Sequence, residues 1–220
     1  MIKILDCLDI AFDKKSNTYE VGIMNHKVQH IHLRQGDMDG ACAVYSLMMY
    51  FIILKVLRRE NVINLGNTFD SDKRCSKGRL YKEFFEIEGL CRSGFSFDQI
   101  EEKLNHSFRK KVSIESYMFD AKVVKDNIDN GFPVMLGISW GKEGHAVLVI
   151  GYEESEKTEL TKLFCLDPGY GIDNCSYWNM VIRLNDAPLR KYSHTCIPCG
   201  GNYSHILLED MLLVRKKELG

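Results

Sequence analysis

The sequence lacks several features that would assign it at once to a broad functional class. Its 29 basic and 30 acidic residues almost cancel, so the formal net charge is only −1. No run of basic residues is longer than three, and the run at 109–111 is typical of a solvated helix end. This balance removes the electrostatic signature of a nucleic-acid-binding protein, and we expect no nucleic acid partner.

An export signal and a membrane-spanning run are also lacking. Lys3 and Asp6 interrupt the first residues, which prevents the apolar core of a signal peptide. The longest apolar stretch, residues 43–54, is interrupted only by Ser46 and is shorter than the roughly 18–20 residues that cross a bilayer. We therefore expect no membrane partner and a cytoplasmic location, where reducing conditions keep most of the eight cysteines as free thiols.

The composition is otherwise that of an ordinary globular protein. Hydrophobic residues make up 45% of the 220 residues and charged residues 27%, while prolines number only four and no internal repeat is visible. A chain of this length can bury a sizeable core without disulfides. We predict a single domain over residues 1–220 and leave the oligomeric state open.

The apolar pattern divides the chain into three parts. A β-hairpin extension is expected in residues 1–34, a mainly helical part in 35–130 and a β part in 131–220, which together predict an α+β fold. The expected helices are a buried one from about Cys42 that ends in the basic residues 55–59, and others at 82–90, 97–108 (capped by Ser96) and 121–128. The expected strands are 133–138, 145–152, 162–167, 178–184 and 206–215.

Cys42 is the cysteine with the most distinctive surroundings. It follows a loop that contains Gly36 and Gly40, and it stands where the apolar helix is expected to begin. A thiol at this place is close to the positive end of the helix dipole and to unpaired amides, which stabilise the nucleophilic thiolate. By position alone, a cysteine at the head of a buried helix is more often a packing residue than a nucleophile.

Three other residues have side chains suited to acting with a thiol. His145 stands between a glycine-containing loop and an apolar strand, where an imidazole can take up and return a proton. Asp167 ends the next strand, and if the two strands pair it can accept the Nδ1 proton of His145. Gln35 precedes Cys42 across the loop, and its amide can donate to an oxyanion together with the Cys42 backbone amide. The alternatives are a strand-end histidine bound to backbone, an Asp-Pro-Gly turn and a solvent-facing glutamine.

The order of these residues resembles that of the papain-like cysteine peptidases, and in particular the C39-like group related to bacteriocin-processing peptidases. The resemblance rests on the stretches 35–47, 144–152 and 166–171, and on the helix–Gly–Pro–strand run over 123–138. It extends in arrangement over residues 33–172.

This resemblance implies a papain-like fold, with a helical left lobe headed by the Cys42 helix, an antiparallel β right lobe and an active site between them. It implies Cys42 as the nucleophile, His145 as general base and then acid, Asp167 as the orienting residue and Gln35 as the oxyanion donor, with no cofactor. The sequence departs from the family pattern in two places. Gln35 precedes Cys42 by seven positions, one more than expected, and Ala43 stands where the family often has glycine or tryptophan.

A Cys-x-x-Cys pair near the C-terminus lies outside this resemblance. Cys196 and Cys199 are flanked by His194 and His205, and these four side chains are weak candidates for a tetrahedral zinc site. A redox pair and a glycine-rich surface loop with free thiols are the other interpretations, and we expect the loop. The cysteines at positions 7, 75, 91, 165 and 175 are scattered and expected to be structural.

The leading hypothesis is a cysteine peptidase that hydrolyses a peptide bond in a protein or peptide partner through a thioester on Cys42. Deamidases, transglutaminases and acyltransferases, including bacterial effector toxins, use the same chemistry, and a fold does not choose among them. A papain-like binding domain without turnover is the third hypothesis. A zinc-dependent interaction module at 194–205 is the fourth.

Overall fold

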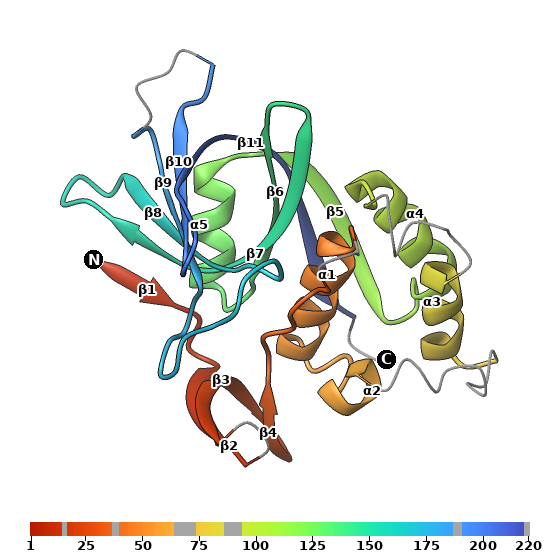
Figure 1. Cartoon of the computed structure of the whole chain (residues 1–220). Coiled ribbons are helices and arrows are strands. Elements are labelled where there is room, and N and C mark those ends of the chain that lie inside the picture. Colours follow the sequence, from red (N-terminus) through yellow and green to blue (C-terminus); the bar gives the residue numbers. More distant parts are fainter. Residues whose placement is uncertain (15–16, 37–39, 64–73, 86–93, 187–190, 218–220) are drawn as a thin grey trace.

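The computed structural model describes residues 1–14, 17–36, 40–63, 74–85, 94–186 and 191–217. Within these ranges the chain is a mixed α+β protein with a large antiparallel sheet and a few helices (Figure 1). The helices are α1 (Cys42–Ile53), α2 (Arg59–Ile63), α3 (Ser76–Phe85), α4 (Phe97–Ser107) and α5 (Ala121–Asp129). The strands are β1 (Ile2–Ile4), β2 (Leu8–Asp13), β3 (Thr18–Asn25), β4 (Lys27–His30), β5 (Val112–Met118), β6 (Val134–Trp140), β7 (Glu143–Glu154), β8 (Leu160–Leu166), β9 (Met180–Arg183), β10 (His194–Pro198) and β11 (Ser204–Lys216).

Six of the described strands close into a barrel. The antiparallel neighbours follow the order β6-β7-β8-β9-β10-β11, and β11 pairs back with β6. β1 extends the sheet beside β7, and β5 extends it beside β11. In the β7–β8 pair, Leu148 lies opposite Leu166, so the end of β8 lies beside the first half of β7. The two strands therefore pair as expected, with the end of β8, next to Asp167, beside the half of β7 that contains His145.

Helix α1 is buried on nearly all sides because its residues are apolar on every face. Ten of its 12 residues are buried, and the hydroxyl of Tyr50 accepts a hydrogen bond from the Val214 backbone amide of β11 (3.0 Å). The helix ends at Ile53, and Lys55 beyond it has a positive φ of 54°. The basic residues 55–59 therefore follow the helix, and the expectation that they form its C-terminus is wrong. None of the described helices is long and apolar enough to span a membrane.

Local signals place the ends of the later helices. Ser96 and Gln99 form a capping box at the start of α4, in which each side chain accepts from the other residue's backbone amide. α5 ends at Asp129, and Gly131 beyond it has φ +82°, a left-handed conformation that commonly follows a helix C-terminus. The helix expected over 82–90 begins earlier, at Ser76, and its predicted part beyond residue 85 lies outside the described residues.

Strand β5 corrects the expectation of a mainly helical segment up to residue 130. It pairs with the second half of β11, from Val112 opposite Lys216 to Met118 opposite Asp210. Only Val112 is fully buried, and residues 115–118 are exposed. Val112 and Ile114 alternate with Ser113 and Glu115, a short strand signal that the expectation of a helical segment overlooked.

The first thirty residues contain more than the expected hairpin. β2 and β3 pair from Leu8 opposite Ile23 onward, and β4 adds a third strand to this small sheet. β1 instead joins the large sheet beside β7. Arg59 holds the chain that leaves β4, since its guanidinium donates to the backbone carbonyls of His30 (3.0 Å) and His32 (2.6 Å).

The segment 194–205 is not the surface loop that we expected. β10 and the start of β11 form an antiparallel hairpin, in which His194 lies opposite Ile206 and Cys196 opposite Ser204. Gly200, with φ +71°, lies in the turn of the hairpin. The glycines therefore mark only the turn, and the polar residues beside them belong to paired strands.

Candidate active site

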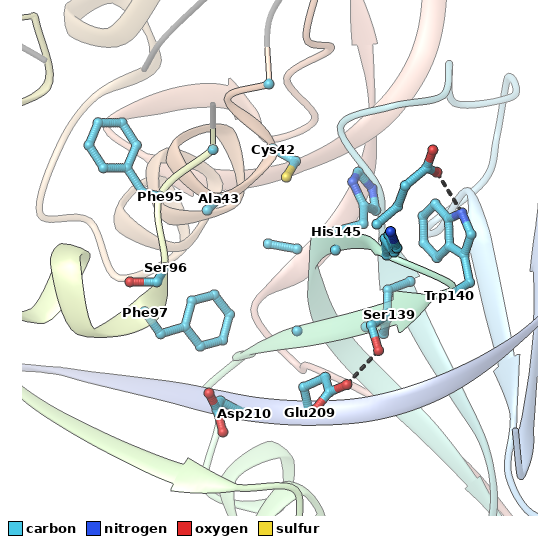
Figure 2. A pocket seen from close by; sticks show the side chains of 18 of the residues that line it. Cys42, Ala43, Phe95, Ser96, Phe97, Ser139, Trp140, His145, Glu209 and Asp210 are labelled. Atoms are coloured by element: carbon cyan, nitrogen blue, oxygen red, sulfur yellow. Dashed lines mark hydrogen bonds between the residues drawn. The ribbon is translucent and has the colours of Figure 1, made fainter. Parts of the chain in front are cut away.

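Cys42 is the first residue of α1, and α1 is held against the strand that carries His145. Ser46 is fully buried one turn further along, and its hydroxyl donates to the backbone carbonyl of Ala146 (3.0 Å). This contact brings the head of α1 to the first half of β7. Cys42 and His145 consequently lie on facing sides of one cavity (Figure 2).

His145 and Asp167 are in direct contact. Nε2 of His145 lies 2.7 Å from Oδ1 of Asp167, whose side chain has no exposed surface. The same Oδ1 accepts from the backbone amide of Gly169 (2.6 Å). The expectation that Asp167 accepts the Nδ1 proton is wrong, since Nε2 makes this contact and Nδ1 is the nitrogen left for Cys42. An imidazole can bind partners on both nitrogens in either ring orientation, and residue order carries no information on which orientation is adopted.

The contacts of Cys42 and His145 favour the charged form of the pair. Burial raises the pKa of the Cys42 thiol, but the hydrogen bond and charge of His145, with hydrogen bonds to the backbone of Ala146 and Ala43, lower it by more. Burial lowers the pKa of His145, but Asp167 and Cys42 outweigh this effect and raise it to about 10. The arrangement therefore favours a thiolate beside an imidazolium, two groups that titrate as a pair.

Cys42 and His145 open onto a cavity of about 850 Å³. Figure 2 shows that α1 and the segment 94–97 contribute one side of it, and that the β6–β7 turn and β11 contribute the other. The other side chains that line it include Gln35, Ala43, Phe95, Phe97, Trp140, Glu143, Glu209 and Asp210. A cavity of this size is within the range of small-molecule and peptide-binding clefts.

Gln35 lines the same cavity as Cys42, although residues 37–39 between them lie outside the described part of the chain. Its backbone amide donates to the carbonyl of Pro168 (2.9 Å), the residue after Asp167. Its side-chain Oε1 is buried and has no hydrogen-bond partner among the described residues. The structure thus brings Gln35 to the cavity that Cys42 and His145 line, and its backbone to the segment that carries Asp167.

The four zinc candidates do not come together. Cys196 is buried, whereas the thiol of Cys199 contacts Asp173 (2.6 Å) and Nδ1 of His205 lies 3.1 Å from the Thr195 hydroxyl. Nδ1 of His194 instead accepts from a backbone amide. Across the part of the chain that the structure describes, no three His, Cys, Asp or Glu side chains are placed to hold a metal ion. The seven described cysteines are free thiols, and position 91 lies outside the described residues.

Two buried polar residues beside Asp167 were missed by the sequence analysis. The side chain of Asn179, which is 1% exposed, binds the Asp167 backbone, and Nε2 of His32 donates to the Asp167 carbonyl (3.0 Å). Burial lowers the pKa of His32, consistent with a neutral ring. The sequence does mark His32 as unusual, since it is a polar residue between the apolar Ile31 and Leu33. For Asn179 the sequence shows only that it precedes a short apolar strand.

The comparison with known families agrees with this arrangement. Residues 25–183 match the family model described as the Peptidase_C39 like family. The chain therefore belongs to this family, which confirms the resemblance to C39-like, papain-like peptidases. The match includes all four predicted site residues, together with His32 and Asn179. No curated protein matches the chain.

Proposed function

We propose that the protein is a cysteine peptidase that hydrolyses a peptide bond in a protein or peptide substrate. One observation carries the proposal: Cys42 heads a buried helix in a cavity and is hydrogen-bonded to His145, whose Nε2 lies 2.7 Å from Asp167. Membership of the C39-like family supports it independently. The lowered pKa of Cys42 and the raised pKa of His145 suit a nucleophile that is a thiolate near neutral pH.

In the proposed reaction the Cys42 thiolate attacks the carbonyl carbon of the scissile bond and forms a C–S bond. The oxyanion accepts hydrogen bonds from the Cys42 backbone amide and from the side chain of Gln35. The His145 imidazolium gives its proton to the leaving amine as the C–N bond breaks, and a thioester remains. Neutral His145 then takes a proton from water, whose oxygen attacks the thioester and releases the acid and the thiolate. Asp167 orients the imidazole and stabilises its charge throughout, and no cofactor takes part.

The proposal also assigns the parts of the chain. The five described helices, all within residues 35–130, form a helical lobe, and the described strands within residues 131–220 form a β lobe, with residues 1–34 as an extension of the same domain. The lining of the cavity by α1 on one side and by β6, β7 and β11 on the other supports a cleft between two such lobes. β5, which lies within 35–130, belongs to the sheet.

Limited alkylation tests the activated thiol. At pH 6 an ordinary thiol with a pKa near 8.5 is less than about 1% thiolate, so iodoacetamide at limiting concentration should label only an activated cysteine. We expect fast labelling confined to Cys42 by peptide mapping, and its loss in His145→Ala. The matched control is Cys199→Ala, because Asp173 raises the pKa of the Cys199 thiol and its removal should change nothing. Slow labelling spread over several cysteines contradicts the proposal.

Turnover of a peptide library, read by mass spectrometry, tests the reaction itself. The wild-type protein should produce shorter peptides, and Cys42→Ala should fold normally and produce none. Full cleavage by Cys42→Ala would disprove the proposed nucleophile. If peptides change mass in a Cys42-dependent way but are not cut, the reaction is deamidation or acyl transfer and not peptide-bond hydrolysis.

A further inference from the structure

Asn179 is a buried amide whose side chain hydrogen-bonds to the segment that carries Asp167, and its Nδ2 also lies 3.2 Å from Nε2 of the buried His32. It lies immediately before β9, is 1% exposed and does not line the cavity that contains Cys42. A buried amide requires partners for both its oxygen and its nitrogen, since an unpaired one is costly. The positions of these partners show what the side chain does.

The side chain of Asn179 binds both backbone polar groups of Asp167. Its Oδ1 accepts from the Asp167 amide (2.6 Å), and its Nδ2 donates to the Asp167 carbonyl (2.8 Å). The last pair in the register of β8 and β9 is Cys165 opposite Met180, two residues before Asp167. The Asn179 side chain thus supplies the hydrogen bonds that hold Asp167 where the strand pairing has stopped.

Asn179 is itself held from two directions. Its backbone amide donates to the carbonyl of Cys165 (3.1 Å), and its backbone carbonyl accepts from the amide of Cys199 in the β10–β11 hairpin (2.7 Å). Its Nδ2 also lies 3.0 Å from the carbonyl of Tyr170 and 3.2 Å from that of Gly171, which closes the turn after Asp167. The Asn179 side chain therefore links the end of β8 to the turn that follows Asp167.

The Asp167 carboxylate depends on this anchoring. Oδ1 accepts hydrogen bonds from Nε2 of His145 (2.7 Å) and from the Gly169 amide (2.6 Å), while Oδ2 has no hydrogen-bond partner among the described residues. The amide of Gly169 belongs to the turn that Asn179 closes. The position of Oδ1 relative to His145 is consequently set through the backbone of residues 167–171.

We propose that Asn179 is a positioning residue that fixes the Asp167 carboxylate and, through its contact with Nε2, the orientation of the His145 ring toward Cys42. The inference rests on the proposed function only in that Cys42 is an activated nucleophile. An amide is required because one planar group must present an acceptor to the Asp167 N–H and a donor to its carbonyl. Asn179→Asp keeps the shape and the acceptor but places a second oxygen against the Asp167 carbonyl.

The test measures the rate of Cys42 alkylation by iodoacetamide as a function of pH, which needs no peptide substrate. In Asn179→Asp we expect the rate at pH 6 to fall by about tenfold and the midpoint of the profile to rise by about one pH unit. In an Asp167→Ala background the same substitution should have no further effect, because Asn179 acts through that carboxylate. The matched control is Asn127→Asp, a buried amide in α5 that binds the Val123 carbonyl and Arg215 away from the cleft. It should lower stability and leave the alkylation profile as in wild type.

The outcomes separate this inference from the proposed function. A wild-type Cys42 that reacts no faster than the other thiols removes the proposed function itself. If wild-type Cys42 is reactive but the folded Asn179→Asp protein has the wild-type alkylation profile, the positioning role alone is overturned. The same holds if Asn179→Asp slows alkylation equally in the wild-type and Asp167→Ala backgrounds. If the variants do not fold, hydrogen exchange of the wild-type protein decides: the Asp167 amide should be strongly protected, and rapid exchange there overturns the inference.

Discussion

Replacing Asp167 by asparagine removes one charge from the candidate site with little change of shape. Oδ1 of Asp167 accepts from His145 Nε2 and from the Gly169 amide, so the oxygen of the new amide can take this position. The amide nitrogen then takes the place of Oδ2, which is buried and has no partner among the described residues. The variant therefore loses a negative charge and buries an unpaired NH₂ group.

The loss of charge is expected to act mainly on the pKa of His145. Two unit charges about 4 Å apart attract each other by about 4 kcal/mol at an effective dielectric constant of about 20. A neutral hydrogen bond contributes about 1 kcal/mol in its place, so about 3 kcal/mol is lost, or roughly two pKa units. The pKa of His145 falls from about 10 by this amount, so the imidazolium beside the Cys42 thiolate is lost at a pH about two units lower than in the wild type. We expect the step that His145 produces in the alkylation profile to move down by about two pH units, and the unpaired NH₂ to lower the free energy of unfolding by about 1–3 kcal/mol.

The assay is the second-order rate constant of iodoacetamide with Cys42 across the pH range, with urea denaturation of the same samples. Asp129→Asn is the matched control, because its carboxylate binds Tyr152 and Lys125 in a network away from the cleft. The control should leave the reactivity of Cys42 unchanged. A folded Asp167→Asn protein whose profile keeps the His145 step at the wild-type pH would refute the charged pair.

Three further predictions follow from the same geometry. Because the pKa of Cys42 is lowered and that of His145 is raised to about 10, peptidase activity should rise with pH as the thiol ionises and fall only as the pH passes about 10; a pH–rate profile that peaks sharply near pH 6 contradicts this. Ser96→Ala removes half of the capping box with Gln99 and should lower the free energy of unfolding by about 1 kcal/mol, seen as a lower urea midpoint with unchanged slope. Leu47→Ala opens a cavity at a fully buried position of α1 and should cost about 2–5 kcal/mol, and a loss below about 1 kcal/mol would mean that the core around α1 is loosely packed.

Much of the candidate site was predictable because its residues stand at the ends of elements with strong local patterns. Cys42 precedes an apolar run that only Ser46 interrupts, which marks the start of a buried helix, and His145 and Asp167 bracket two apolar strands that pair as a hairpin. Asn179 and His32 could not be predicted to act beside Asp167. They are 12 and 135 positions from it in sequence, and nothing local records a contact over such a separation.

The fold shows the same division. The strand β5 was missed because Val112 and Ile114 alternate with polar residues over only four positions and the rest of the strand is exposed, and its seven-residue pairing with β11 defines it. The hairpin β10–β11 was taken for a loop because the glycines in its turn dominate the local composition. For β5, the defining hydrogen bonds come from β11, which is distant in sequence. For β10 and β11, they join the two strands on either side of a glycine-containing turn.

By itself, the sequence determined the buried helix that begins at Cys42, the capping box at Ser96 and the strands that carry His145 and Asp167. Each of these depends on hydrophobic periodicity or on hydrogen bonds within a few residues, which are local properties. Only the tertiary structure decided that Nε2 of His145 meets Asp167, that Asn179 holds the backbone of Asp167 and that the four zinc candidates stay apart. Ring orientation and long-range polar contacts depend on how the closed barrel and α1 pack against each other, and that packing arises from the whole chain at once.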